Sequence, residues 1–221
     1  MKLHFRIVAI ALLAFTGACE KQASQVGQEV AIPGVDAGGE RSILEVPAAD
    51  YPRVVLTTDA GAVVIELYED KAPLTVRNFM TYVEAGHYDN TVFHRVIGNL
   101  LVQGGAYTPE YRLKPDRGFI RSEANNGLRN LRGTVTAARR ANDSDSAGAQ
   151  FFINVVDNPQ FDFVSMADAR SRGYTVFGRV VDGMEAIDGM RSVKVGPRAG
   201  IGDATPVKPI IIRQIRTTET P

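Results

Sequence analysis

A succession of short β-type runs, separated by turn residues, constrains the fold of this chain more than any other feature. The runs are rich in valine, isoleucine, threonine and phenylalanine, which favour strands, and glycine, proline, aspartate or asparagine separates most of them. They read RVVLTT, AVVIEL, TVFHRVI, LLVQ, GTVTAA, QFFINVV, YTVFGRVV, SVKV and PIIIRQI. Eight or nine short strands of this kind predict a mainly β fold, either a sandwich or a closed barrel.

Two stretches have helical periodicity instead. In APLTVRNFMTYVEAGHY, four apolar residues between Val76 and Val83 recur at the spacing of one helical face. Pro73 suits the first turn of this helix, and Gly86 suits its C-terminal end. The stretch DGMEAIDGM predicts a second, shorter helix with Asp182 as its N-cap. The chain is therefore expected to form one strand-rich domain, residues 50–217, with two helices.

The N-terminus has the features of an export signal. Lys2, His4 and Arg6 make a basic start, and residues 7–15 form an apolar run. This run is too short to span a bilayer but suits the core of a signal peptide. Residues 1–18 are therefore predicted to be a signal peptide. Residues 19–49 have no sustained periodicity and are predicted to be a flexible tether.

Cys19 is the only cysteine in the chain and follows the apolar run directly after small residues. This arrangement resembles the lipobox of bacterial lipoproteins, in which the cysteine becomes the lipidated first residue, although Thr16 replaces the usual aliphatic residue. The resemblance implies a periplasmic protein anchored in a membrane by an acyl chain. Glu20 in the next position favours the outer membrane. The alternative is ordinary secretion, with cleavage after Ala18 and a free Cys19.

Composition and motifs exclude several classes of function. Lysine plus arginine equals aspartate plus glutamate at 25 each, so nucleic acid is not an expected partner. Outside the signal peptide only His87 and His94 remain, which do not make a familiar zinc site. The stretch NDSDSAG resembles the start of a calcium loop but lacks its third acidic ligand and its closing glutamate, and it is interpreted as a solvated turn. No nucleophile elbow or phosphate loop is present. We therefore expect neither a cofactor nor a metal.

What remains is the stretch TVFHRVIGNLLVQGG, which sets Arg95 and Gln103 among apolar residues. A guanidinium stays protonated, so Arg95 is a fixed hydrogen-bond donor rather than a base. Rotation about an Xaa–Pro bond needs little more than such a donor. Its barrier of about 18–20 kcal/mol arises from amide resonance. A donor to the prolyl nitrogen stabilises the twisted state, in which the nitrogen lone pair is free, more than either planar state.

Four ordered motifs point to a family. FHRVIGNLLVQGG resembles the signature of the cyclophilins, and SEANNGLRNLRGTVTAAR, SAGAQFFINVVDNPQFDF and GYTVFGRVVDGMEAID resemble the segments that follow it. The resemblance runs from about Arg53 to Ile215. It implies a peptidyl-prolyl isomerase built as a closed eight-stranded antiparallel β-barrel capped by two helices, with no cofactor.

The resemblance also implies roles for individual residues. Arg95 matches the catalytic arginine, and Gln103 matches the glutamine that holds the substrate backbone and orients the arginine. Phe152 matches the floor of the proline pocket. The other positions that match substrate-binding residues are Leu100, Leu101, Phe161, Tyr174, Ala138 and Gln150.

The chain departs from the family pattern in a few places. Leu100 replaces an aromatic residue, Gly98 and Asn99 stand where Pro-Gly is usual, and Arg139 replaces a common asparagine. Each matched residue taken alone is more often structural, and His94, beside Arg95 on a strand, is interpreted as structural.

Taken together, the motifs predict a monomeric isomerase that acts on Xaa–Pro segments of folding envelope or secreted proteins. The alternative is a non-catalytic proline-peptide binding module or chaperone that uses the same groove, which the altered loop from Gly98 to Leu101 keeps open.

Overall fold

The computed structural model describes residues 51–218, and the predicted signal peptide, the tether and Cys19 lie outside them. These residues form helices α1 (Pro73–Glu84) and α2 (Met184–Arg191), a 3₁₀-helix η1 (Pro159–Phe161) and ten strands. The strands are β1 (Arg53–Thr58), β2 (Gly61–Leu67), β3 (Thr91–Ile97), β4 (Leu101–Tyr107), β5 (Thr134–Ala137), β6 (Phe151–Asn154), β7 (Val176–Asp182), β8 (Val195–Arg198), β9 (Gly202–Pro206) and β10 (Ile210–Thr217). In this part of the chain no helix is both long and apolar enough to cross a membrane.

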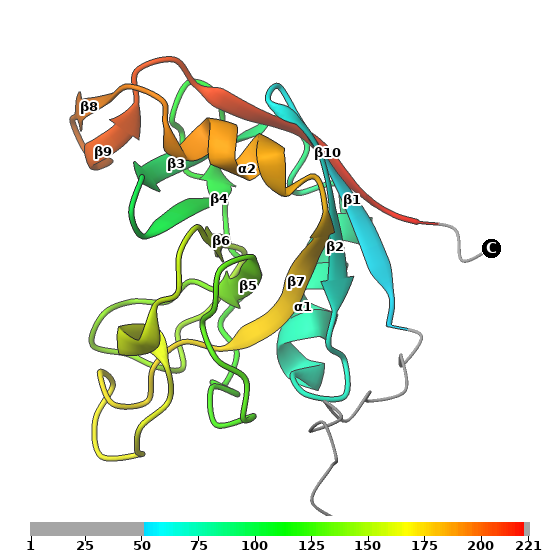
Figure 1. The fold of residues 1–221 in the computed structure, drawn as a ribbon, viewed down its shortest axis with the longest axis vertical. Helices are drawn as coiled ribbons and strands as arrows, with labels where there is room; N and C mark the ends of the chain where they lie inside the picture. The colour runs from blue at the N-terminus through cyan, green and yellow to red at the C-terminus, as the bar shows by residue number, and fades with distance from the viewer. Residues whose placement is uncertain (1–50, 219–221) are drawn as a thin grey trace, which may run out of the picture. The chain divides into compact units, whose positions relative to one another are not determined.

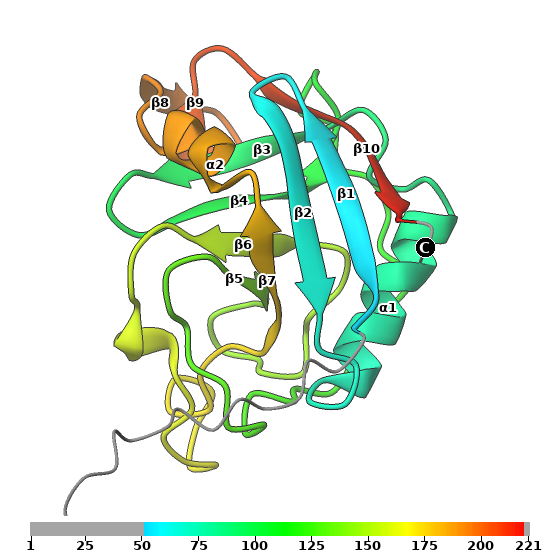
Figure 2. The same cartoon turned by 45° about the vertical axis from the view of Figure 1, so that its right-hand side comes forward.

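Eight of the strands close into one barrel, which decides between the two architectures that the strand count allowed. They follow the order β1-β10-β3-β4-β6-β5-β7-β2, and every neighbouring pair is antiparallel. Figures 1 and 2 show β2, β1 and β10 side by side. The expected closed barrel with two helices is confirmed.

The remaining two strands, β8 and β9, form a separate sheet. The predicted strand SVKV was placed too early, because Ser192 is still the C-cap of α2 and β8 begins only at Val195.

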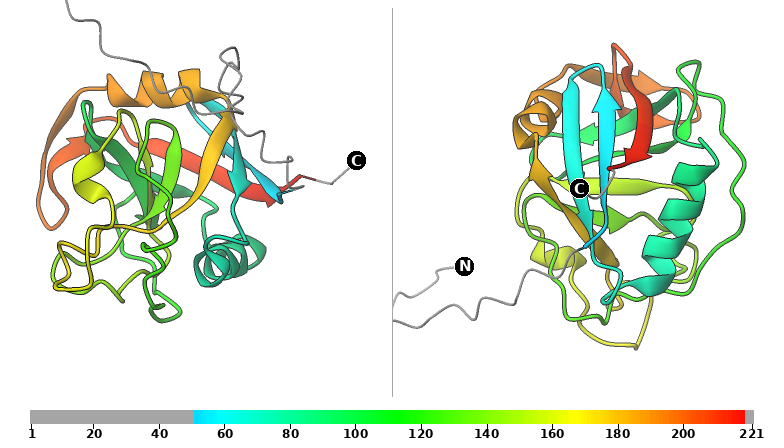
Figure 3. Two further views of the ribbon diagram at one scale, coloured as in Figure 1. Left: turned by 60° about the horizontal axis from the view of Figure 1, so that its bottom comes forward. Right: turned by 90° about the vertical axis from the view of Figure 1, so that its right-hand side faces the viewer.

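The core fills the barrel and includes side chains from both helices. In Figure 1, α2 lies at the top of the barrel and α1 at its lower right, and Figure 3 gives two further views of this arrangement. From α1, the Phe79 ring lies 5.7 Å from the Phe151 ring and 5.2 Å from the Phe177 ring. From α2, Ile187 and Met190 are fully buried. Because both helices contribute side chains to one continuous core, the barrel is a solid scaffold for the residues on its outer face.

The ends of α1 follow the sequence closely. Pro73 is its first residue, and Gly86, just after the C-cap, has the positive φ of 61° that ends many helices. The N-terminal amides of α1 bind a residue far along the chain: the Glu123 carboxylate accepts hydrogen bonds from the amides of Leu74 (3.0 Å) and Thr75 (2.8 Å). An acidic group in this place also interacts favourably with the helix dipole.

The start of α2 differs from the prediction. Asp182 is not the N-cap, because it still belongs to β7, and Gly183 takes the cap position with a φ of 81° and no side-chain cap. A β-carbon at Gly183 would overlap the carbonyl oxygen of Ala62 on β2. Close packing of the β7–α2 corner on β2 therefore requires glycine.

We expect Gly183→Ala to lower the free energy of unfolding by about 2 kcal/mol or more, because the variant combines an unfavourable φ with a steric overlap. The measurement is urea unfolding followed by circular dichroism. Gly189→Ala is the matched control: it lies within α2, and an added β-carbon would meet no atom within 4 Å other than those of its chain neighbours and of the helix backbone itself. The free energy of unfolding of this control should rise by up to about 1 kcal/mol. Equal unfolding midpoints for the two variants would contradict the packing argument.

Candidate functional site

A second apolar cluster lies apart from the barrel core. It arises from the alternation of side chains along β6: Phe151 packs in the core, whereas Phe152, the next residue, belongs to the second cluster. This cluster, called here the outer apolar cluster, consists of Leu100, Leu101, Ala138, Phe152, Phe161 and Tyr174.

Three aromatic rings shape the outer apolar cluster. The ring centre of Phe152 lies 5.7 Å from that of Phe161 and 5.7 Å from that of Tyr174, and the last two lie 5.0 Å apart. All three pairs meet edge to face, a favourable arrangement for aromatic side chains. Phe152 is only 2% exposed, whereas Phe161 and Tyr174 are partly exposed. Phe152 therefore forms the floor of the cluster, and the other two rings form walls.

A hydrogen-bonded relay runs beside this cluster across neighbouring segments. Gln103 on β4 lies opposite Arg95 on β3 and opposite Phe152 on β6. The Arg95 Nη1 donates to Gln103 Oε1 at 3.2 Å, and Gln103 Nε2 donates to Gln150 Oε1 at 3.0 Å. Since Gln103 and Phe152 are cross-strand partners on one face, the relay holds a cation at the edge of the outer apolar cluster.

The arrangement offers donors and an apolar surface rather than a nucleophile. Arg95 is exposed, and the bond to Gln103 is one of the five that its guanidinium N–H groups could make. A cavity of about 230 Å³ adjoins the relay, lined in part by Gln103, Ala138 and Gln150. A ligand on the outer apolar cluster could therefore reach the guanidinium and extend its backbone into this cavity.

A buried network of asparagines lies beside the cluster and holds its wall segments. Asn158 Nδ2 donates to the Leu100 carbonyl at 2.8 Å, and Asn130 Nδ2 donates to the Phe161 carbonyl at 3.0 Å and more weakly to the Tyr174 carbonyl at 3.5 Å. Asn154, with no exposed surface, joins the two asparagines by bonds of 2.7 Å to Asn158 and 3.3 Å to Asn130. The network thus fixes three wall residues of the cluster.

Sequence reasoning missed this network. The only signal was three asparagines inside the motif segments, and asparagine is rarely buried without partners.

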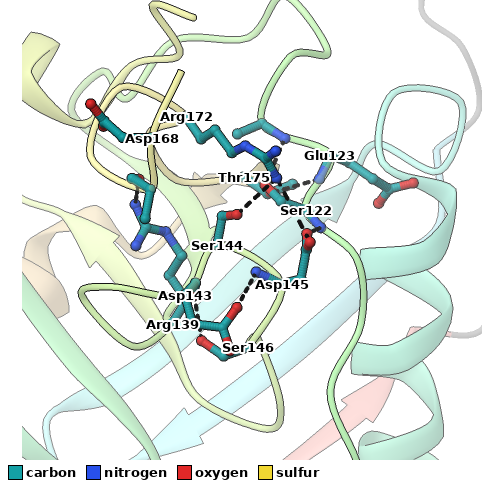
Figure 4. Close-up of polar contacts among 12 residues, drawn as sticks. Ser122, Glu123, Arg139, Asp143, Ser144, Asp145, Ser146, Asp168, Arg172 and Thr175 are labelled. Atoms are coloured by element: carbon teal, nitrogen blue, oxygen red, sulfur yellow. Dashed lines mark hydrogen bonds and ion pairs between the residues drawn. The ribbon is translucent and has the colours of Figure 1, made fainter. Parts of the chain in front are cut away.

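The loop NDSDSAG packs as a hydrogen-bonded turn, as Figure 4 shows. Asp143 Oδ1 accepts from the Asp145 amide at 3.0 Å, and Asp145 Oδ1 accepts from the Ser122 amide at 2.8 Å. Arg172 adds a bond to Ser144 Oγ at 3.1 Å. The two carboxylates therefore bind backbone groups. Within residues 51–218 no group of three histidine, cysteine or acidic residues is placed to hold a metal ion.

The structure brings the predicted site residues of the barrel into two adjoining sets. The relay contains Arg95, Gln103 and Gln150. The outer apolar cluster contains Leu100, Leu101, Ala138, Phe152, Phe161 and Tyr174. Cys19 lies outside the described residues.

His94, interpreted as structural, is buried with 6% exposure, whereas its neighbour Arg95 is exposed. The pairing of β3 with β4 shifts register around His94, and its ring centre lies 4.7 Å from that of Tyr107. Within the described residues its Nδ1 has no hydrogen-bond partner. Burial, and secondly the charge of Arg95, lower the pKa of His94 from its usual 6.5 to about 4. His94 is therefore neutral at pH 7 and adds no charge beside Arg95.

Comparison with known proteins gives consistent matches. The family model "Cyclophilin type peptidyl-prolyl cis-trans isomerase/CLD" matches residues 53–217. The chain is 47% identical over 163 residues to peptidyl-prolyl cis-trans isomerase cyp18 of Streptomyces antibioticus, covering 74% of this chain and 96% of that protein. It is 44% identical over 166 residues to peptidyl-prolyl cis-trans isomerase B of Escherichia coli, covering 75% of this chain and 99% of that protein.

Among solved structures, a cyclophilin type peptidyl-prolyl cis-trans isomerase of Cryptosporidium parvum superimposes with a TM-score of 0.62 at 24% identity, covering 77% of this chain and 99% of that one. A second structure of that protein, determined in the presence of the dipeptide Ala-Pro, gives a TM-score of 0.61 at 24% identity and covers 76% of this chain and 99% of that one. At this level of identity the likeness shows the fold.

The lowered pKa of His94 predicts a pH dependence of stability. In the unfolded chain His94 binds a proton below about pH 6.5, whereas in the folded chain it does so only near pH 4. The contribution of His94 to the free energy of unfolding is therefore fully present above pH 6.5 and is lost as the pH falls from 6.5 to 4. The loss from His94 should be on the order of 3 kcal/mol. The variant His94→Phe should lose less stability than the wild type between pH 6.5 and 4 in urea unfolding. The pKa of His87 is also lowered, chiefly by burial. Because His87 is present in both proteins, the difference between them reports on His94 alone. If the free energy of unfolding fell equally with pH in the wild type and in His94→Phe, the role assigned to His94 would be wrong.

Proposed function

The chain belongs to the cyclophilin-type peptidyl-prolyl cis-trans isomerases, and from this premise we propose that it accelerates Xaa–Pro rotation in envelope or secreted proteins, anchored to a membrane through Cys19. The observation that carries the assignment of the site is the Arg95–Gln103–Gln150 relay at the edge of the outer apolar cluster. The substrate is an exposed Xaa–Pro segment of an unfolded or loop region.

In this proposal Arg95 acts on the barrier itself. The prolyl nitrogen cannot accept a hydrogen bond while its lone pair is conjugated with the carbonyl, and it becomes an acceptor when the bond is twisted. A guanidinium N–H directed at this nitrogen stabilises the twisted state selectively. Gln103 restrains the guanidinium through Oε1, so the donor is oriented before the substrate arrives.

The outer apolar cluster supplies orientation and a low dielectric. A proline ring placed on Phe152 between Phe161 and Tyr174 would displace water from around the rotating bond. Leu101, 2% exposed, completes the floor beside Gln103 on β4. Removing water strengthens the single charge-assisted hydrogen bond on which the mechanism depends.

The proposed location rests on the N-terminal sequence alone. The basic start, the short apolar run and Cys19 support export and lipidation, and an acyl chain would hold the domain at a membrane surface. Uncatalysed Xaa–Pro isomerisation takes tens to hundreds of seconds and can limit folding. An isomerase among newly exported chains would therefore shorten the time that they spend unfolded.

We expect Arg95→Ala to lower kcat/KM about 10²- to 10³-fold, the effect of removing one transition-state donor in other enzymes. Because Arg95 is exposed, the midpoint of thermal unfolding should not change. The measurement is NMR exchange spectroscopy on a short Xaa–Pro peptide. Arg77→Ala, an exposed arginine on α1, is the control for lost charge and should keep full activity.

The same spectra separate catalysis from binding alone. A protein that only bound proline peptides in this groove would shift the peptide signals without accelerating exchange between the isomers. Wild-type activity in Arg95→Ala would remove Arg95 from the mechanism while leaving the family assignment unaffected.

The anchor has its own test. Cys19→Ser should move the protein from the membrane fraction to the soluble fraction of the cell envelope, because serine cannot form the thioether to the lipid. Mass spectrometry of the wild-type N-terminus should show a lipid-modified cysteine as the first residue. An unmodified Cys19 in a soluble wild-type protein would instead indicate ordinary secretion.

A further inference from the structure

Arg139 ties two segments together beside the outer apolar cluster. It follows β5, and its guanidinium donates to backbone carbonyls of two chain segments, residues 140–141 and residues 169–173. Its Nη1 donates to Arg140 at 2.8 Å and Ala141 at 3.0 Å, within its own segment. Its Nε donates to Gly173 at 2.9 Å, and its Nη2 donates to Ala169. One side chain therefore fastens the loop 162–173 to the end of β5.

The same guanidinium covers a wall of the cluster. Its Cζ lies 4.2 Å from the ring centre of Tyr174, in the range of a favourable cation–π contact. The Tyr174 ring therefore contacts Arg139 in addition to the rings of Phe161 and Phe152. The Tyr174 backbone is held separately, since its amide donates to the Phe161 carbonyl at 2.9 Å. Arg139 thus restrains the ring, and other contacts restrain the main chain.

Arg139 lines the same cavity as Gln103 and Gln150 but makes no hydrogen bond to the groups proposed to act on the rotating bond. Its side-chain hydrogen bonds within the described residues all go to backbone carbonyls between residues 140 and 173. The Arg95–Gln103–Gln150 relay is built from other side chains. Losing the Arg139 side chain should therefore change the fit of a proline ring without changing the donor at the prolyl nitrogen.

The geometry points to Arg139 as a positioning residue for proline recognition: it holds the Tyr174 ring as a preformed wall of the pocket. A wall that is ordered before binding saves the cost of ordering it when the ligand arrives. Arg139 acts through Tyr174 and the loop 162–173 and does not touch the reacting bond. This inference rests on the proposed role of the outer apolar cluster as the proline pocket.

The first test compares substrate binding with turnover. In Arg139→Ala, KM and the Kd for a short Xaa–Pro peptide should rise about five- to tenfold, and kcat should stay within about twofold of the wild type. The control is Arg170→Ala, an exposed arginine on the same loop, which removes the same charge and should leave KM, Kd and kcat unchanged. An unchanged Kd in Arg139→Ala would overturn the inference, even if its unfolding midpoint fell.

A double-mutant cycle tests whether Arg139 acts through Tyr174. The variant Tyr174→Ala should bind the peptide more weakly, and adding Arg139→Ala should then change Kd by less than about twofold, because the wall that Arg139 holds is already gone. A full five- to tenfold loss in the Tyr174→Ala background would show that Arg139 acts by another route and would reject the inference.

The readouts keep the two proposals distinct. If the wild type bound the peptide without accelerating exchange, the catalytic role of the site would fail, but the Kd values would still decide the role of Arg139. If the wild type were active and Arg139→Ala bound normally, only the positioning inference would fail.

Discussion

The proposed site depends on the two hydrogen bonds of the Gln103 side-chain amide. Its Oε1 accepts a hydrogen bond from Arg95, and its Nε2 donates one to Gln150. These two bonds orient the amide, because a flipped amide would place its NH₂ group against the guanidinium and its oxygen against the oxygen of Gln150. Since Gln103 is also the cross-strand partner of Phe152, the same residue sets the cation next to the apolar surface. Pairing of β3, β4 and β6 in one closed barrel makes this alignment possible.

Around this relay, the outer apolar cluster is held by polar contacts as well as by apolar packing. The side-chain amides of Asn130 and Asn158 donate to the backbone carbonyls of the wall residues Phe161 and Leu100. Arg139 donates a hydrogen bond to the Gly173 carbonyl and makes a cation–π contact with the Tyr174 ring. Such directional bonds define positions more narrowly than apolar contacts do. In the proposed mechanism a single donor acts on the rotating bond, so the placement of the proline ring relative to that donor would decide how well the bond is catalysed.

Much of the fold and most of the candidate site could be predicted from the sequence, because they follow from the apolar pattern along the chain and from the order of the motifs. Alternating strands and the period of α1 follow from which residues are apolar, and motif order was enough to group Arg95, Gln103 and Phe152. The exceptions depend on contacts between distant segments. Gly183 caps α2 because Ala62, on a different strand, approaches it closely. Arg139 was noted only as a departure from the family pattern, since its partner Ala169 lies in the stretch between the last two motifs and Gly173 is only the first residue of the last motif.

The central claim is that the guanidinium of Arg95 meets the nitrogen of a proline whose ring lies on Phe152. The most direct test is a crystal structure of the protein with a short Xaa–Pro peptide. The account predicts the proline ring in van der Waals contact with Phe152, and an Arg95 nitrogen within about 3–3.5 Å of the prolyl nitrogen. A peptide bound elsewhere on the barrel, or a bound peptide with Arg95 turned into solvent, would contradict it.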